Sequence, residues 1–214
     1  MVFSARTGQI ISNLIHMKLK AFLLASGLLS LAEQSRAADT YNIDTAHSSV
    51  GFAIAHMVIN TVHGHFNQFS GTVSVDGKNV AEAKGTIDTK SIDTGQPKRD
   101  THLKSADFFD AEKYPTITFQ SKRAEKKGDE TVLVGDFTMH GVTKELSLPM
   151  KLNGPIKDPM GMTRIGLQAK TKVNRKDYGI SYNKALEAGG VMLGEDVEIE
   201  INAEAVKKSD AAKK

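Results

Sequence analysis

Histidine is the residue type in this sequence best suited to metal chemistry, and four of the seven histidines lie within nineteen residues: His47, His56, His63 and His65. His63 and His65 are two positions apart, so both rings would point to the same side of a strand. A turn over residues 58–61 would return the chain and bring His56 close to them. Three neutral imidazoles on facing strands would suit zinc. The alternative is that these histidines are polar side chains at the end and rim of a strand.

Signals for enzymatic chemistry are otherwise absent. No carboxylate stands at a spacing typical of zinc hydrolases, and the sequence has no cysteine, no Gly-x-Ser-x-Gly, no His-Glu-x-x-His and no phosphate-binding loop. Residues 93–95 (Asp-Thr-Gly) resemble the triplet of aspartic proteases but stand alone. We therefore predict no catalytic residue, no metal site and no cofactor. The alternative is a metal-dependent stress- or quinone-related enzyme that uses His56, His63 and His65.

The elements that would position these residues are strands, because apolar and polar residues alternate almost throughout residues 38–205. About eight strands result, each with one apolar and one polar face, which fits antiparallel pairing. Hairpin turns are expected at residues 76–77, 127–129 and 140–141, and a loop at residues 154–161. Such strands form either a sandwich or a closed barrel, and periodicity does not decide between the two.

Two long segments, residues 88–114 and residues 174–195, interrupt the alternation. Each is too long for a hairpin turn, so we expect both to pack over one end of the strands or to form a mouth there. Within the first segment, residues around 100–110 are predicted to form one or two short helical turns. Asp100 or Thr101 is the expected N-cap, because both side chains can accept a hydrogen bond from the first turn.

The first 37 residues have the pattern of a secretory signal peptide. A basic region precedes an apolar run of eleven residues (21–31), which is too short to span a bilayer, and small residues precede a cut after Ala37. We expect export to the periplasm; the alternative is a buried N-terminal helix. Met17 stands just before the basic region, so either translation starts there or residues 1–16 lengthen that region.

Removal of this segment changes the charge of the chain. The whole chain has a net charge of +3, and residues 1–37 alone carry four basic residues and one acidic residue, so the remainder is neutral. A nucleic-acid partner therefore loses its main electrostatic support. Without cysteine there is neither a disulfide nor a cysteine-linked lipid anchor. We expect one domain over residues 38–206 and a disordered, basic tail over residues 207–214.

Three blocks of the sequence together resemble one family. They are residues 44–48 (DTAHS), residues 99–121 (RDTHLKSADFFDAEKYPTITFQS) and residues 135–143 (GDFTMHGVT). In these blocks the chain is similar to the YceI family of secreted, lipocalin-like proteins associated with polyisoprenoids and other long-chain lipids. The resemblance implies an all-β fold: an eight-stranded antiparallel barrel with one or two short helices near the barrel end.

The resemblance also implies a function and a site. The expected function is that of a periplasmic carrier that holds a long apolar ligand, a polyisoprenoid or a fatty-acid-like amphiphile, without a stable membrane anchor. Transient membrane contact and a homodimer remain open. The intervening polar residues, such as Thr118, are expected to face water. The expected tunnel walls are Phe52, Ile54, Phe119, Phe137, Leu146, Leu148 and Leu167.

Three further residues are candidates for the polar end of the ligand. Arg99 and His102 belong to the charged start of the predicted helical segment, and Tyr178 follows Arg175 in a second segment that resembles the family. The alternative for the first two is structural, because short polar segments before a helix usually cap it. The alternative for Tyr178 is a solvated turn in which the ring covers the edge of the core.

Overall fold

The computed structural model describes residues 38–187 and 189–211 of the 214-residue chain. The predicted signal peptide therefore lies outside the described residues, as does the end of the predicted tail. Within the described part, no helix is both long enough and apolar enough to cross a bilayer.

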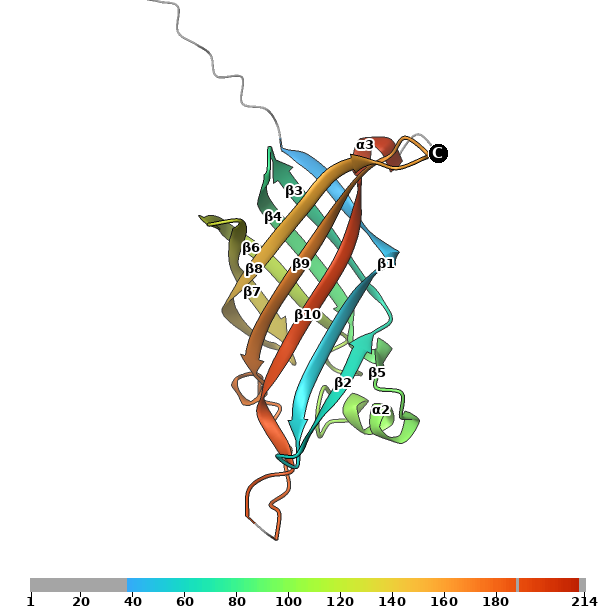
Figure 1. Ribbon diagram of the computed structural model, residues 1–214. Helices are drawn as coiled ribbons and strands as arrows, with labels where there is room; N and C mark the ends of the chain where they lie inside the picture. Colours follow the sequence, from blue (N-terminus) through green and yellow to red (C-terminus); the bar gives the residue numbers. More distant parts are fainter. Residues whose placement is uncertain (1–37, 188, 212–214) are drawn as a thin grey trace, which may run out of the picture. The chain divides into compact units, whose positions relative to one another are not determined.

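Eight antiparallel strands close into a barrel, which confirms the predicted fold class (Figure 1). Each strand pairs with its neighbours in the barrel, and β10 pairs back onto β1 from Tyr41–Lys207 to His56–Leu193. Closure therefore removes the free sheet edges that β1 and β10 would otherwise present to each other. The barrel strands are β1 (Asp39–His56), β3 (Phe69–Asp76), β4 (Asn79–Asp88), β6 (Thr116–Lys127), β7 (Glu130–Met139), β8 (Val142–Lys157), β9 (Thr163–Asn174) and β10 (Leu193–Lys207).

Strand β1 has two successive partners along its other edge. Its first residues pair with β3, and its second half pairs with β2 (Asn60–Phe66) in the register Val50–Phe66 to His56–Asn60. The short β5 (Ile92–Asp93) adds to the outer edge of β2. The lower half of the wall thus opens outward from β1 through β2 and β5 (Figure 1).

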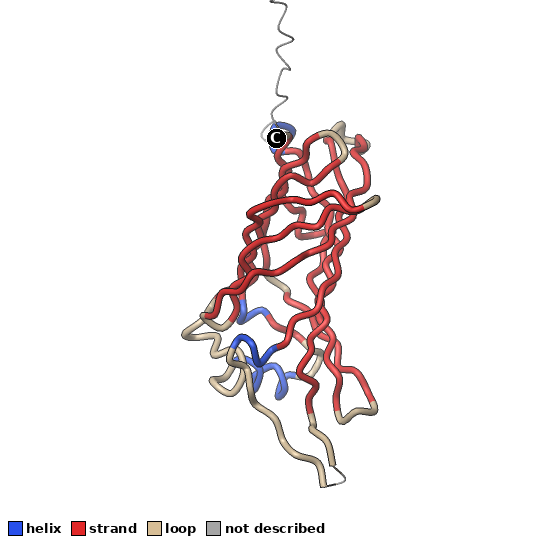
Figure 2. Tube along the Cα trace, turned by 90° about the vertical axis from the view of Figure 1, so that its left-hand side faces the viewer, coloured by secondary structure: helices blue, strands red, loops and turns tan. Residues whose placement is uncertain are grey.

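The two ends of the barrel differ. The short helix α3 (Lys208–Ala211) lies at the end where β1 begins, and α2 (Pro97–Lys104) lies at the end where β1 finishes. Figure 2 shows the other helical turns and the long loops gathered at the α2 end. They include the 3-10 turns η1 (Thr89–Ser91) and η2 (Arg175–Tyr178). Both interrupting segments therefore belong to one end of the barrel, as their length predicts.

Helix α2 begins earlier than the sequence predicts. Its N-cap is Gln96, whose side chain accepts from the backbone N–H of Lys98, and a proline follows at the first helical position. The prediction that Asp100 or Thr101 caps the helix is therefore wrong. Asp100 instead accepts from both the backbone N–H and the hydroxyl of Thr94, at 2.9 and 2.5 Å, and so ties the loop before the helix to its first turn.

The hairpin turns lie where the sequence places them, but the predicted loop at residues 154–161 is too long. Strand β8 continues to Lys157, with a register shift against β9 between Asn153 and Ile156. The shift coincides with the cis peptide bond between Gly154 and Pro155. The connection to β9 is therefore only the turn at residues 158–162.

The inward side chains fill the barrel tightly at the α3 end. Leu133 and Ala205 have no exposed surface there, and Val80 and Ile165 are almost as buried. Dense packing of this kind is typical of a solid protein core. Toward the α2 end the inward side chains are larger and only partly buried, among them Phe52, Phe69 and Ile199. The core therefore closes one end of the barrel and leaves space in the other.

Candidate ligand-binding cavity

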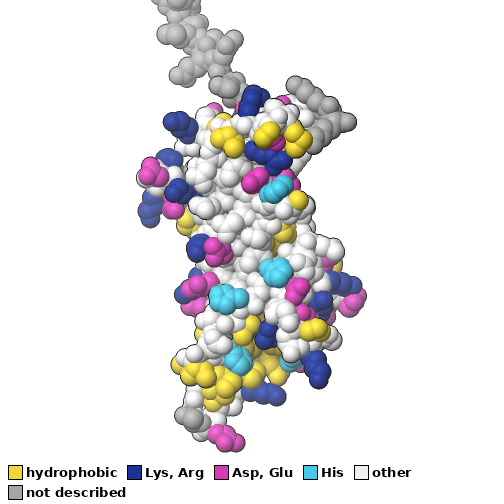
Figure 3. Space-filling view, turned by 45° about the vertical axis from the view of Figure 1, so that its right-hand side comes forward, with side chains coloured by type: hydrophobic (Ala, Val, Ile, Leu, Met, Phe, Trp, Pro, Cys, Tyr) yellow, Lys and Arg dark blue, Asp and Glu magenta, His cyan; other side chains and the backbone are white. Residues whose placement is uncertain are grey.

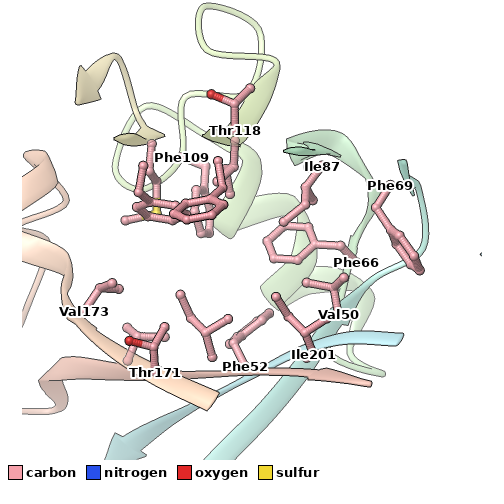
Figure 4. A pocket seen from close by; sticks show the side chains of 18 of the residues that line it. Val50, Phe52, Phe66, Phe69, Ile87, Phe109, Thr118, Thr171, Val173 and Ile201 are labelled. Carbon is pink, nitrogen blue, oxygen red and sulfur yellow. The ribbon is translucent and has the colours of Figure 1, made fainter. Parts of the chain in front are cut away.

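A cavity of about 360 Å³ occupies the space inside the barrel. Its wall consists of inward-facing side chains from the barrel strands together with residues of α2 and of the loops at the α2 end. Figure 4 shows Phe52 and Val173 on one side, with Ile87 and Phe109 facing them across the space. The volume lies in the range of small-molecule binding sites. The almost wholly apolar lining suits a hydrocarbon rather than a polar substrate.

The cavity is elongated along the barrel. Along β10 its lining residues run over ten positions, from Leu193 at the α2 end to Ala203 near the solid core. At ~3.3 Å per residue and with strands tilted by ~40°, this corresponds to roughly 25 Å along the barrel axis. The shape therefore fits a chain-like molecule laid along the barrel.

All seven predicted wall residues line this cavity: Phe52, Ile54, Phe119, Phe137, Leu146, Leu148 and Leu167. Alternation finds them because each barrel strand turns every second side chain inward. Thr118, which the same alternation predicts to face water, is half-buried, and Figure 4 shows its side chain directed away from the cavity.

Aromatic side chains from different elements hold the wall together near the α2 end. The ring of Phe66 packs against Phe52 and Phe109, with centroid distances of 5.7 and 6.1 Å. Tyr182 packs against Phe108 at 4.9 Å and joins the loop before β10 to the segment after α2. Such contacts are worth ~1 kcal/mol each beyond the area they bury. They fix the loops that surround the mouth of the cavity.

Two of the three predicted head-group residues lie on the cavity wall. Arg99 donates from Nε to the Thr94 hydroxyl at 2.7 Å and from Nη2 to the Thr94 carbonyl at 2.9 Å. His102 bonds through Nε2 to Asp107 at 2.8 Å, and its ring packs edge-on against Tyr182. These contacts orient both side chains, but neither residue caps the helix, so the capping role that the sequence offered as the alternative is not found.

The third residue, Tyr178, does not line the cavity. Its side chain is buried in the core around the α2 end, where the ring packs edge-on against Phe137 at 5.5 Å. Burial raises the pKa of its hydroxyl above the usual value, which keeps the group neutral. The structure thus matches the alternative in which the ring covers the edge of the core.

Among the polar residues of the wall that sequence reasoning missed, Arg175 is the most buried. Arg175, the first residue of η2, lines the cavity although its residue surface is only 3% exposed. Arginine is rarely buried, so its type alone predicts a surface position. The signal for it in the sequence is its place at the start of the second family-like segment, three residues before Tyr178.

The three histidines of the candidate zinc site, His56, His63 and His65, do not point toward a common centre. His56 turns inward and lines the cavity, whereas His63 and His65 are exposed on the outer face. The register explains this, because His63 pairs with Ala53, whose side chain points opposite to those of Phe52 and Ile54. A zinc site formed by His56, His63 and His65 is therefore excluded by the geometry of the hairpin.

A different set of possible ligand atoms lies near the α3 end. Atoms of Asp44, His47 and Glu204 lie within 4.8 Å of one another. However, the guanidinium of Arg164 already occupies this group and donates from Nη1 to Asp44 at 2.7 Å and to Glu204 at 3.2 Å. The positive charge that these carboxylates require is thus supplied by an arginine, and we assign no metal to them.

Exposed apolar side chains flank the cavity at the α2 end. Val58 and Ile59, at the tip of the hairpin between β1 and β2, are 79% and 83% exposed. Val191 is also exposed, and the tip is joined to its loop by a hydrogen bond from Met57 N–H to the Met192 carbonyl at 2.7 Å. Figure 3 shows apolar side chains gathered at the lower end of the view. Patches of this kind mark contact surfaces.

Comparison with known proteins places this fold in a family. The family model described as a YceI-like domain matches residues 41–205. A UPF0312 protein of Staphylococcus aureus is 41% identical over 169 residues, which cover 77% of this chain and 95% of that protein.

Solved structures show the same architecture. The YceI protein of Campylobacter jejuni is 31% identical with a TM-score of 0.63, covering 77% of this chain and 96% of that one. BcnA of Burkholderia cenocepacia, at 23% identity, has a TM-score of 0.65 and covers 76% of this chain and 98% of that one. A polyisoprenoid-binding domain from Saccharophagus degradans, at 17% identity, has a TM-score of 0.58 and covers 80% of this chain and 99% of that one. The barrel, its cavity and the match over residues 41–205 together show that this chain belongs to the YceI-like domain family.

Proposed function

We propose that this protein is a carrier that encloses one long apolar chain in its barrel. The observation that carries the proposal is the apolar cavity of about 360 Å³, which is closed by solid packing at the α3 end and surrounded by loops at the α2 end. A barrel whose core is completely filled would have no such space. The proposal assigns no catalytic step to any residue.

The length of the cavity favours a chain longer than an ordinary membrane acyl chain. The hydrocarbon core of a bilayer is ~30 Å thick, so a chain that spans one leaflet covers ~15 Å. The cavity runs for roughly 25 Å along the barrel axis. A polyisoprenoid, or a long fatty-acid-like amphiphile, fills more of this length with buried hydrocarbon than a short lipid does. The polyisoprenoid-binding domain from Saccharophagus degradans, which shares the fold, supports the first of these classes.

Transport is needed because such a ligand does not cross water by itself. Each buried methylene contributes ~0.8 kcal/mol, so a long chain stays in a membrane unless a protein shields it. The membrane and the tunnel offer similar apolar surroundings to the ligand. The direction of net transfer is therefore set by the small difference between the free energies of the ligand in the two environments. We expect modest selectivity along the tunnel and more at its polar end.

The proposed working compartment is the periplasm, reached through the predicted signal peptide. The exposed tip residues Val58, Ile59 and Val191 flank the cavity, so we propose that this end touches a membrane transiently while the ligand passes. The intact mass of protein from the periplasmic fraction tests the export step. A mature chain that begins at Ala38 is expected, and a chain that keeps residues 17–31 would contradict it.

The carrier function is tested by extraction of the purified protein with organic solvent, followed by lipid mass spectrometry. We expect one long-chain lipid per barrel, enriched over the lipids of the host membrane. A preparation of the unfolded protein, extracted in parallel, controls for carried-over membrane. Wild-type protein that contains no lipid, and that takes up none from vesicles, would overturn the proposal.

A further inference from the structure

Arg175 is a buried cation in the wall of an apolar cavity. It stands at the start of η2 and lines the cavity together with Ile180 and Leu193, and only 3% of its surface is exposed. A guanidinium stays protonated at any physiological pH. Burial of such a group is costly unless an anion or a full set of acceptors compensates it.

The acceptors that the protein supplies are incomplete. Nε donates to the Gly194 carbonyl and Nη1 donates to the Ile180 carbonyl, each at 2.8 Å. Nη2 is buried and has no hydrogen-bond partner among the described residues. The two bonds fix the plane of the guanidinium between the loop after η2 and the start of β10. The third nitrogen is thus held in a defined place with hydrogen-bonding capacity unused.

The charge of Arg175 is not compensated either. Within the described part of the chain it forms no ion pair, whereas Arg164, whose side chain is 14% exposed, pairs with both Asp44 and Asp158. Glu195 is the acidic residue that acts on Arg175 electrostatically, but its carboxylate is bound by Lys176. Burial consequently lowers the pKa of Arg175 below its usual value. The cavity wall therefore carries a positive charge whose counter-ion is missing.

We propose that Arg175 binds an anionic head group, a carboxylate or a phosphate, of the lipid whose chain occupies the tunnel. The inference rests on the carrier function and adds the chemical class of the ligand's polar end. An anionic oxygen that reaches the guanidinium from the cavity would accept a hydrogen bond from it and supply the missing charge, and guanidinium is well suited to both oxyanions. Arg175 lies at the α2 end of the cavity, so the head group would sit near the mouth and the chain would point toward the α3 end.

The proposal predicts a preference for charged over neutral forms of the same chain. Two matched pairs of radiolabelled probes test it: oleate against methyl oleate, and geranylgeranyl monophosphate against geranylgeraniol. Binding is measured by equilibrium gel filtration of delipidated wild-type protein. We expect the charged member of at least one pair to bind about tenfold more tightly or better, as one charge-assisted hydrogen bond provides. The pair with the larger ratio identifies the source of the charge as carboxylate or phosphate.

Substitution of the arginine assigns the preference to this side chain. Arg175→Gln should bring the ratio close to one, mainly because the charged probe binds more weakly. Arg164→Gln is the matched control, because it removes a mostly buried arginine at the other end of the barrel and should keep the wild-type ratio. If Arg175→Gln does not fold, the ratios of the wild-type protein still decide the case.

The outcomes separate this inference from the carrier function. Equal binding of the charged and neutral members of both pairs by wild type would overturn the role of Arg175 and leave the carrier standing. A preference that persists unchanged in a folded Arg175→Gln protein would also overturn it. Failure of all four probes to bind would contradict both proposals.

Discussion

Arg164 and Asp44, 120 residues apart in the sequence, form an ion pair of 2.7 Å near the α3 end of the barrel. Both side chains are largely buried, with 14% and 19% of their surface exposed. The same guanidinium donates from Nε to Asp158 at 2.8 Å. The hydrogen bond from Arg164 is the main reason that the pKa of Asp44 falls from 3.8 to about 2. It lowers the pKa of Asp158 as well. The pair joins β1 to β9 beside the solid core.

This pair makes the stability of the barrel depend on pH under acid conditions. Because the pKa of Asp44 is lower in the folded than in the unfolded chain, its contribution is complete above pH 3.8 and is lost as pH falls toward about 2. We expect Asp44→Asn to lower the free energy of unfolding by about 2 kcal/mol near neutral pH, and by about half of that near pH 3. Urea unfolding of both proteins across this range measures the difference.

An exposed ion pair serves as the control. Arg123 and Glu125 are bonded at 3.0 Å, but both side chains are more than half exposed. Glu125→Gln should therefore change the free energy of unfolding by less than ~1 kcal/mol. If Asp44→Asn behaves like this control at neutral pH, the pair near the α3 end does not stabilise the barrel as described.

Most of the fold could be predicted because a barrel wall has a strict period of two. Every second residue of a strand faces the cavity, so the apolar type of Phe52, Ile54 and Leu167 at alternating positions predicts that they face inward. Where the backbone departs from ideal pairing, the pattern fails. Strand β8 passes through Pro155 with a register shift, and the composition of that stretch is typical of a loop. Closure of the strands into a barrel came from the family resemblance and not from periodicity.

The polar part of the site was less predictable, for two physical reasons. The relative faces of His56 and His63 depend on the number of residues in the intervening turn, which includes Met57 and Val58 at positive φ, a conformation unusual for these residue types. The burial of Arg175 depends on carbonyls of segments that pack around it only in the folded barrel. Neither relationship is local in sequence, so residue type and spacing could not reveal it.

Gly64 leaves room for the ring of Phe52. The two residues are register partners on β2 and β1, and a Cβ at position 64 would overlap that ring and lie 2.9 Å from Thr94 Cγ2. We predict that Gly64→Ala moves the Phe52 ring into the cavity and reduces bound lipid at least by about half, with a loss of stability of ~1 kcal/mol. Lipid quantification and thermal unfolding measure the two effects.

A second substitution and a neighbouring glycine give the controls. Phe52→Leu in the Gly64→Ala background should restore lipid binding, because the smaller side chain leaves the space again. Gly51→Ala, whose new Cβ would meet its nearest atom at an ordinary 3.6 Å, should leave lipid binding unchanged. Equal lipid content in Gly64→Ala and wild type would show that the Phe52 ring does not limit the cavity.

Enlarged side chains should act differently at the two ends of the cavity. Ile54 is only partly buried and lies in the open half, whereas Leu148 is 5% exposed and lines the closed end of the cavity, within the buried cluster near the α3 end. We expect Ile54→Phe to displace lipid with little loss of stability. Leu148→Phe should cost 1–3 kcal/mol through overpacking. Chemical denaturation and lipid content are measured on both variants. If Ile54→Phe is destabilised as strongly as Leu148→Phe, the half of the cavity around Ile54 is not open.

The hairpin tip at the mouth combines backbone strain with exposed apolar surface, and the two can be separated experimentally. Met57 and Val58 have φ values of 53° and 63°, a conformation that costs a β-branched residue ~1–2 kcal/mol and that Asn-Gly adopts readily. The double variant Met57→Asn, Val58→Gly should therefore be more stable than wild type by ~1 kcal/mol.

The same double variant should also transfer bound lipid more slowly to vesicles of phosphatidylethanolamine and phosphatidylglycerol, because it presents less apolar surface to the membrane. Ile156→Ser removes an exposed apolar side chain near the other end and is expected to leave the transfer rate unchanged. A stabilised double variant that transfers lipid as fast as wild type would show that the tip does not touch the membrane during exchange.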